Sequence, residues 1–445
     1  MKALRYLFQK HVQPLGLVRE GRATPAPVLP LQTPVLRRKP RKAKDHAADM
    51  LRIACPDPNA EDTARDHFFN KAQHLARQED WDVLTDMIHS ADQARKLTPG
   101  FMPVAELMAY GARADVVSAA EHALMDGKPA KGAPLMAGIE ALEHVLAQRQ
   151  DDHIAAAIVA QAHMDIGWAW RGTGWDAEVP DRNRAAFAAH FDRASDIVSQ
   201  FCGTAHGSPF LASTCCALLA NAEQDVHRVA DHYEVLIDLD PSNPRSMRAM
   251  GNHLLPRWFG NYAELELESR RTAARTQDIW GAGGYTWTQF DAIACDDQAC
   301  ANLDVPFFVE GLRDILARQP NPYTANLLAA YCANSVGQAF SGNDEADHNR
   351  SQIAQSAHWI IRDHLTELHP MIWAHAARGF DNNLRVRSAK SRPVSASSLP
   401  TPGRRRWRSD GTGSAKNRPS RVFIGVSPCA SSCTHPLGYL MTRQS

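Results

Sequence analysis

Apolar residues recur at intervals of three and four in fifteen consecutive segments of this 445-residue chain, which is the pattern of amphipathic helices. Short loops join the segments, and no stretch before residue 420 has the alternating pattern of a strand. Many helices joined by short loops predict an all-α fold built from helical hairpins. The segments are 60–78, 81–97, 103–125, 133–149, 153–170, 182–201, 208–220, 223–239, 244–254, 262–276, 285–294, 304–318, 321–336, 347–366 and 370–379.

Four of these helices stop in the same way and restart as a new helix two or three residues later. Aligned on Leu146, Leu236, Leu316 and Leu365, their ends lie 90, 80 and 49 residues apart. These intervals fit one or two units of about 40–45 residues, which is longer than a strict tetratricopeptide repeat. In three cases a proline marks the stop, because proline cannot continue a helix but suits the first turn of the next one. The pattern predicts a right-handed α-solenoid of stacked hairpins.

A resemblance supports this architecture. The stretch from Tyr233 to Pro244, followed by Met247, Met250, Gly251 and Leu254, resembles the end of one tetratricopeptide repeat and the start of the next. Residues 253–265 are similar to a segment of a bacterial tetratricopeptide-like helical domain of unknown function. That family has two glycines after a Pro-basic-Trp sequence, whereas Phe259 takes the place of the first one here. The resemblance implies a helical solenoid over residues 140–380 and lends no catalytic residues.

Charge divides the chain into three parts. Residues 46–384 carry 26 Lys and Arg against 46 Asp and Glu, a net charge of −20. The Pro-rich segment 1–45 has a net charge of +9, and the Ser-, Arg- and Pro-rich segment 385–445 has a net charge of +11. We expect an acidic helical-repeat body between two disordered basic ends.

Two interpretations of residues 385–445 remain open: a genuine basic tail, and an out-of-frame continuation of the gene. The second is favoured because the predicted helix from Pro370 to Phe380 has an apolar face, formed by Ile372, Trp373, Ala376 and Phe380, that a further helix should cover.

Cysteine usage and hydropathy indicate the compartment. The nine cysteines are odd in number and irregular in spacing, which is typical of free thiols in a reducing cytosol. The first residues are interrupted by charges too often for a signal peptide, and no apolar run reaches the roughly 20 residues of a membrane span. We expect a soluble cytoplasmic protein.

The sequence contains no motif that predicts catalysis, a cofactor or a metal. No Gly-x-Ser-x-Gly nucleophile elbow occurs, and the histidines are not spaced as helical ligand pairs. The glycine-rich stretch from Trp280 to Tyr285 lacks the order of a phosphate-binding loop, so it is interpreted as a flexible turn between helices.

Large aromatic and arginine side chains are the candidate partner-binding residues. Such side chains usually pack hairpins together, but they also dominate the binding energy of interfaces, so both roles stay open. The candidates are Trp168, Arg171, Arg257, Trp258, Trp280 and Trp287.

The preferred hypothesis is a non-enzymatic scaffold that binds a protein or peptide, preferably basic, in a concave face. Nucleic acid is expected to bind only through the basic ends, and no membrane association is expected. The alternative is an enzyme or metal-binding protein with a site built from scattered residues such as His163, Asp165 and Arg171 beside Trp168. A deep pocket with convergent polar groups would favour the alternative, and an open groove would favour the scaffold.

Overall fold

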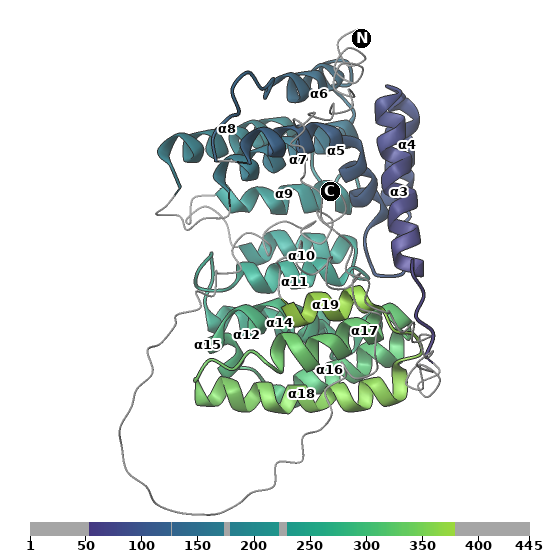
Figure 1. Cartoon of the computed structure of the whole chain (residues 1–445), viewed down its shortest axis with the longest axis vertical. Helices are drawn as coiled ribbons and strands as arrows, with labels where there is room; N and C mark the ends of the chain where they lie inside the picture. Colours follow the sequence, from purple (N-terminus) through teal and green to yellow (C-terminus); the bar gives the residue numbers. More distant parts are fainter. Residues whose placement is uncertain (1–52, 126, 173–178, 222–228, 379–445) are drawn as a thin grey trace, which may run out of the picture. The chain divides into compact units, whose positions relative to one another are not determined.

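Helices provide almost all of the regular structure in the computed structural model, which describes residues 53–125, 127–172, 179–221 and 229–378 (Figure 1). Within these ranges there is no strand, only two isolated β-bridges. The predicted all-α class is therefore confirmed for this part of the chain. The predictions for residues 1–45 and 385–445 lie outside the described residues.

The helices follow one another with short connections. They are α3 (Ala60–Arg77), α4 (Trp81–Gln93), α5 (Val104–Leu124), α6 (Ala137–Ala147), α7 (His153–Arg171), α8 (Asp181–Val198), α9 (Pro209–Leu218), the 3₁₀ turn η2 (Leu219–Asn221), α10 (Val229–Leu239), α11 (Pro244–His253), α12 (Tyr262–Arg275), α13 (Gln277–Trp280), α14 (Gly283–Cys295), α15 (Asp297–Ala301), α16 (Val305–Arg318), α17 (Pro322–Ala330), the π-helical turn η3 (Tyr331–Val336), α18 (Asp344–His364) and α19 (Pro370–Arg378).

Local sequence signals set where the helices begin. The side chains of Asn59, Asp152, Ser208 and Asn321 each accept a hydrogen bond from a backbone N–H in the first turn of the helix that follows. This satisfies amides that have no partner within the helix. Pro244, Pro322 and Pro370 are the first residues of α11, α17 and α19, as the stop-and-restart pattern predicts.

The turn in the glycine-rich stretch is shorter than the sequence predicts. Only Gly281 and Ala282 separate α13 from α14, and Gly283 and Gly284 already belong to α14. Gly281 has φ of 59°, a left-handed conformation that side chains rarely adopt, and a Cβ there would lie 2.1 Å from Asp314 Oδ2. Gly281 therefore permits a tight turn between α13 and α14, close to α16.

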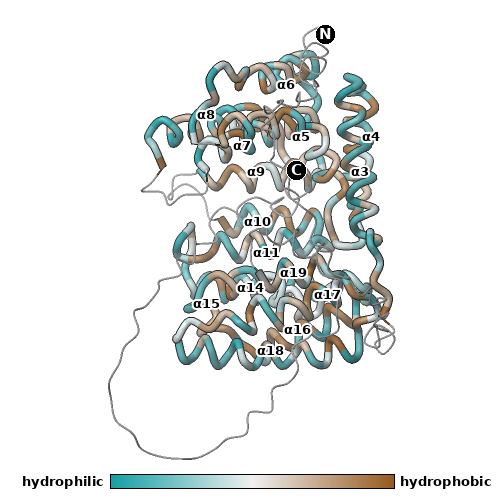
Figure 2. Tube along the Cα trace, viewed as in Figure 1, coloured by the Kyte–Doolittle hydropathy of each residue, from teal (hydrophilic) through white to brown (hydrophobic). Residues whose placement is uncertain are grey.

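The apolar residues form two main clusters that meet within α9. Phe210 and Leu211 belong to the cluster built mainly from α3 to α8, whereas Ala212 and Cys216 belong to the cluster built from α10 to α18. Helices α3 and α18 each pack against these clusters with one face. Hydrophilic residues predominate along both helices (Figure 2).

Helices often make their most extensive contacts with a helix other than the next one in sequence. Helix α11 packs mainly against α14 and touches the following helix α12 only slightly. A Cβ on Gly251 of α11 would lie 1.7 Å from the Thr288 carbonyl oxygen of α14, so glycine permits this close approach. Helix α14 is buried around most of its circumference, whereas α12 buries only one side.

The loop between α4 and α5 joins the two clusters. Arg95 Nε donates to the Leu239 carbonyl oxygen at 2.8 Å, and the Phe101 ring packs edge-on against Trp280 with centroids 5.6 Å apart. Residues before α3 also reach a distant part of the chain, because the Leu368 amide donates to the Ala54 carbonyl oxygen at 2.8 Å. These links tie the first hairpin to the second half of the described region.

Helix α19 packs on α17 and η3. Its Trp373 contacts the second apolar cluster, and the indole Nε1 donates to Asn326 Oδ1 of α17 at 2.9 Å. Ile372, Trp373 and Ala376 are half-buried, so the expectation that a further helix covers this face stays a prediction. Phe380 lies outside the described residues.

Candidate functional site

A groove with a volume of about 500 Å³ opens among α3, α4 and α5. Most of its lining is apolar, and Val83 leaves 44% of its surface exposed there. The lining residues are Phe68, Val83, Asp86, Met87, Ser90, Ala91, Ala94, Lys96, Val104 and Met108. We call this feature the α3–α5 groove.

Helix α4 provides most of the groove because it is apolar on two sides. Leu84 and Ile88 are fully buried in the first apolar cluster. Val83 and Met87, each one residue earlier, lie one turn apart and line the groove. Because successive helical residues are separated by about 100°, the second side of this doubled stripe is an apolar surface that no helix of the described residues covers.

Two charged side chains border the apolar lining. Lys96 places its Nζ 4.9 Å from the centroid of the Phe68 ring, within the range of a cation–π interaction. Asp86 is exposed on α4. The groove can therefore accept an apolar side chain in its floor and a basic side chain at its edge.

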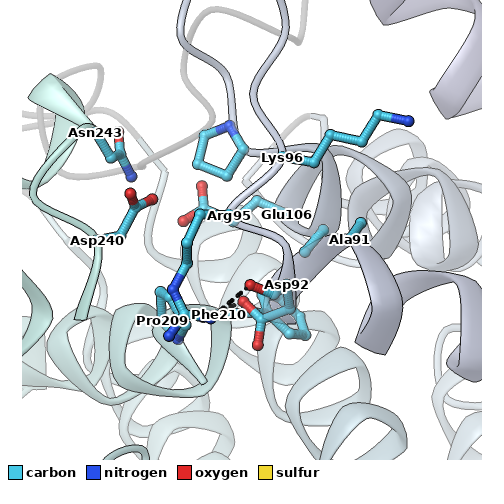
Figure 3. Close-up of a pocket in the computed structure, with 11 residues that line it drawn as sticks. Ala91, Asp92, Arg95, Lys96, Glu106, Pro209, Phe210, Asp240 and Asn243 are labelled. Atoms are coloured by element: carbon cyan, nitrogen blue, oxygen red, sulfur yellow. Dashed lines mark hydrogen bonds between the residues drawn. The ribbon is translucent and has the colours of Figure 1, made fainter. Parts of the chain in front are cut away.

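A smaller recess adjoins the groove, with Ala91 and Lys96 common to both (Figure 3). Three carboxylates from three separate segments line it: Asp92 of α4, Glu106 of α5 and Asp240 after α10. Asp92 accepts hydrogen bonds from the Ser208 hydroxyl at 2.5 Å and from the Phe210 amide at 2.9 Å. It therefore holds the start of α9 against α4.

Burial dominates the electrostatics of this recess. It raises the pKa of both Asp92 and Glu106, against the opposing influence of hydrogen bonds and nearby arginines. The pKa of Asp240 is raised to about 6, mainly by burial and next by the charge of Glu106, while Arg95 opposes the shift. Asp240 Oδ1 is buried without a hydrogen-bond partner.

The recess is nevertheless too small for a substrate. Its volume is about 10 Å³. A single water molecule needs roughly 10–15 Å³, so these convergent carboxylates enclose at most one water. The polar groups and the accessible space are thus in different places.

The residues of the enzyme alternative are not brought into one site. On α7, His163 Nε2 lies 2.9 Å from Glu143 Oε1, and His163 Nδ1 lies 2.9 Å from His190 Nδ1. Asp165 instead accepts a hydrogen bond from Arg113 Nε at 2.7 Å, with both side chains almost fully buried. The reason is helical geometry, because residues two apart on a helix face different directions.

Arg171 and Trp168 form a separate pair. The Arg171 guanidinium lies 5.7 Å from the Trp168 ring, which packs edge-on against Phe187. Trp168 is half-buried against the first apolar cluster.

The other predicted partner-binding residues also do not form one surface. Trp280 and Trp287 are 0% and 1% exposed, so both are core residues, and Trp280 Nε1 donates to the Pro241 carbonyl oxygen at 2.8 Å. Trp258 is half-buried against the second apolar cluster, and the exposed Arg257 donates to Asn252 Oδ1 at 2.8 Å. Only Trp168, Arg171, Arg257 and Trp258 retain surface that a partner could touch.

In the ranges that the structure describes, no three His, Cys, Asp or Glu side chains are arranged to hold a metal ion. None of the helices in those ranges combines the length and the apolar character that crossing a membrane requires.

Comparison with known proteins yields no relative: no protein-family model, curated protein or solved structure matches this sequence.

Proposed function

We propose that this protein is a non-enzymatic helical scaffold that binds a basic peptide segment of a partner protein in the α3–α5 groove. In this proposal the helices form a right-handed, tetratricopeptide-like α-solenoid, and the protein acts in the cytoplasm. The observation that carries the proposal is the contrast between the two cavities. The open one is about 500 Å³ and mainly apolar, whereas the polar one holds at most a water molecule.

The chemistry of the groove defines the partner. An apolar floor formed by Phe68, Met87 and Met108 suits an apolar anchor, and methionine adapts to anchors of different shape. Residues 46–384 carry a net charge of −20, and Asp86 stands at the edge of the groove. A segment with apolar side chains one helical turn apart, flanked by Lys or Arg, matches both features.

The enzyme alternative is less well supported by the same geometry. Catalysis requires polar groups that face a space where a substrate can bind. The cluster of Glu143, His163, His190 and Arg193 is satisfied by its own hydrogen bonds between α6, α7 and α8. The carboxylates of the recess have no such space.

A pair of matched valines tests the proposal. Val83 in the groove and Val235 on α10 are both exposed helical residues, at 44% and 39%. Full-length Val83→Asp and Val235→Asp proteins would be compared in binding to an array of basic, amphipathic peptides. Peptides selected on the wild-type protein would then be measured by fluorescence anisotropy.

We expect Val83→Asp to weaken binding by about tenfold or more, because a charge enters the apolar lining, and Val235→Asp to change it by less than about twofold. Binding should also weaken as salt rises from about 0.05 to 0.5 M, because screening shortens the reach of the acidic surface. Equal losses in the two variants would refute the groove as the binding site, and binding that ignores salt would refute the basic partner.

A further inference from the structure

Three histidines from separate parts of the chain lie side by side next to α4. They are His89 of α4, His153 at the start of α7 and His206 in the loop between α8 and α9. The ring centroids of His89 and His153 are 5.5 Å apart, and those of His153 and His206 are 4.5 Å apart. The Phe201 ring packs edge-on against His206, with centroids 5.7 Å apart. We call His89, His153 and His206 the histidine triplet.

The α8–α9 loop is held in place from two sides. Gln93 of α4 donates from Nε2 to the carbonyl oxygens of His206 and Gly207, at 3.1 and 3.4 Å. Within the loop, His206 Nδ1 lies 2.8 Å from the Cys202 carbonyl oxygen, and the Cys202 thiol lies 3.0 Å from the Thr204 hydroxyl oxygen. Gln93 therefore holds the loop on α4, and the His206 ring holds it on α7.

The surroundings of His153, the middle ring, favour its neutral form. Its Nε2 is buried and has no hydrogen-bond partner among the described residues. Burial, and then the charges of His206 and His89, lower the pKa of His153 below its ordinary value of 6.5. His153 is also the first residue of α7, where the positive end of the helix dipole opposes a further positive charge.

The carboxylates beside the triplet do not offset this effect. Asp152 raises the pKa of the middle imidazole, but it also caps the first turn of α7 and lies 3.7 Å from Arg149. On α4, Asp86 and Asp92 each lie about one turn from His89. Asp86 is exposed, and Asp92 accepts its hydrogen bonds from the start of α9. A charged imidazole would therefore compete with existing contacts of Asp152 and Asp92.

The geometry points to a pH-sensitive contact, in which the histidine triplet holds the α8–α9 loop against α7 while its imidazoles are neutral and releases the loop when acid protonates them. Neutral rings at these distances pack favourably, whereas charged imidazoles 4.5 and 5.5 Å apart repel one another. This inference does not depend on the proposed binding function.

The direction of the pH effect follows from the lowered pKa of His153. A group of this kind contributes stability that is fully present above its unfolded pKa and lost as pH falls through its folded pKa. Release of the loop exposes His153 to water and restores its ordinary pKa of 6.5, so acid favours the released loop. The contact should be complete above about pH 7 and weaken progressively as pH falls below about 6.5.

Hydrogen exchange measures the release directly. The full-length protein would be labelled at about pH 7.5 and about pH 5.5, with correction for the intrinsic exchange rate at each pH. The amides that report on the loop are those of His206, Gly207 and Ser208, which donate to carbonyl oxygens within it. We expect their protection to fall by about fivefold or more at the lower pH. The amides of α14, a buried helix without histidine, should keep their protection.

Substitutions separate the triplet from other groups that titrate in acid. His153→Phe keeps a ring between the other two and removes the central charge, so loop protection should differ by less than about twofold between the two pH values. His89→Phe, at an exposed position, should make the loss of protection smaller than in the wild type. The matched control is His144→Phe on α6, where the exposed His144 ring lies 2.9 Å from Gln148, and it should keep the wild-type response.

Two results would overturn the inference. One is equal protection of the wild-type loop at both pH values. The other is an undiminished loss of protection in His153→Phe and His89→Phe, because the acid response would then come from a group outside the triplet, such as Asp92.

Discussion

Replacing Asp240 with asparagine should stabilise the protein at neutral pH and leave its stability unchanged in acid. Asp240 is 3% exposed, and its Oδ1 has no hydrogen-bond partner. The Ser242 amide donates to this carboxylate, and an asparagine side-chain oxygen can accept the same hydrogen bond. The substitution therefore removes the charge and keeps the local turn.

The pKa of Asp240 gives the magnitude. It is raised from 3.8 to about 6 in the folded protein. A group with a raised folded pKa contributes stability that is fully present below its unfolded pKa and lost as pH rises through its folded pKa. At about pH 8 the ionised Asp240 should thus cost up to about 3 kcal/mol relative to a neutral group, from two pKa units at 1.36 kcal/mol each. Near pH 4 the cost falls below about 1 kcal/mol, because the folded carboxyl is then protonated and the unfolded one is only partly ionised.

Urea unfolding followed by circular dichroism, at about pH 8 and about pH 4, measures this difference. The matched control is Asp238→Asn in the last turn of α10, two residues before Asp240, where the side chain is 56% exposed and pairs with Arg275. An exposed pair of this kind is worth less than about 1 kcal/mol, so the control should change stability little at either pH. A gain for Asp240→Asn that is the same at both pH values, or a loss at pH 8, would refute the argument that a buried charge strains the recess.

Two further predictions concern the packing. Arg113→Ala should destabilise the protein by about 3–5 kcal/mol in urea unfolding, because it leaves the buried Asp165 carboxylate without Arg113. The double variant Arg113→Met, Asp165→Leu should recover most of this loss, because no buried charge is left in place of the ion pair. Trp280→Ala should lower the free energy of unfolding by about 3–5 kcal/mol, because the side chain is fully buried. Trp258→Ala, at a half-buried position, should lower it clearly less. Equal losses would contradict the assignment of Trp280 to the core.

The positions of the helices could be predicted from the sequence because the signals that set them are local. Apolar periodicity, the capping side chain of Asn321 and the first-turn proline Pro322 all act within a few residues of α17. The pairing of helices could not be predicted in this way. The contact of α11 with α14 depends on comparing the apolar surface of every helix, and the hydrogen bond between Leu368 and Ala54 joins residues far apart in the chain.

The candidate sites were harder to predict for related reasons. Val83 and Met87 have the spacing of core residues, and only the absence of a covering helix in the described structure makes them a groove. Large aromatic residues were predicted to bind a partner instead, although Trp280 and Trp287 lie in the core. The contact of the Thr204 hydroxyl with the Cys202 thiol depends on the conformation of the loop, which residue type alone does not encode.

The end of α4 and its C-cap residue Ala94 contact the groove, the recess and the loop between α8 and α9. Ala91 and Ala94 line the groove, Asp92 holds the start of α9 at the recess, and Gln93 holds the loop that carries Cys202. Consecutive helical residues point about 100° apart, so a single turn can present side chains to three different neighbours. The α3–α5 groove and the loop between α8 and α9 therefore share one structural support, the end of α4.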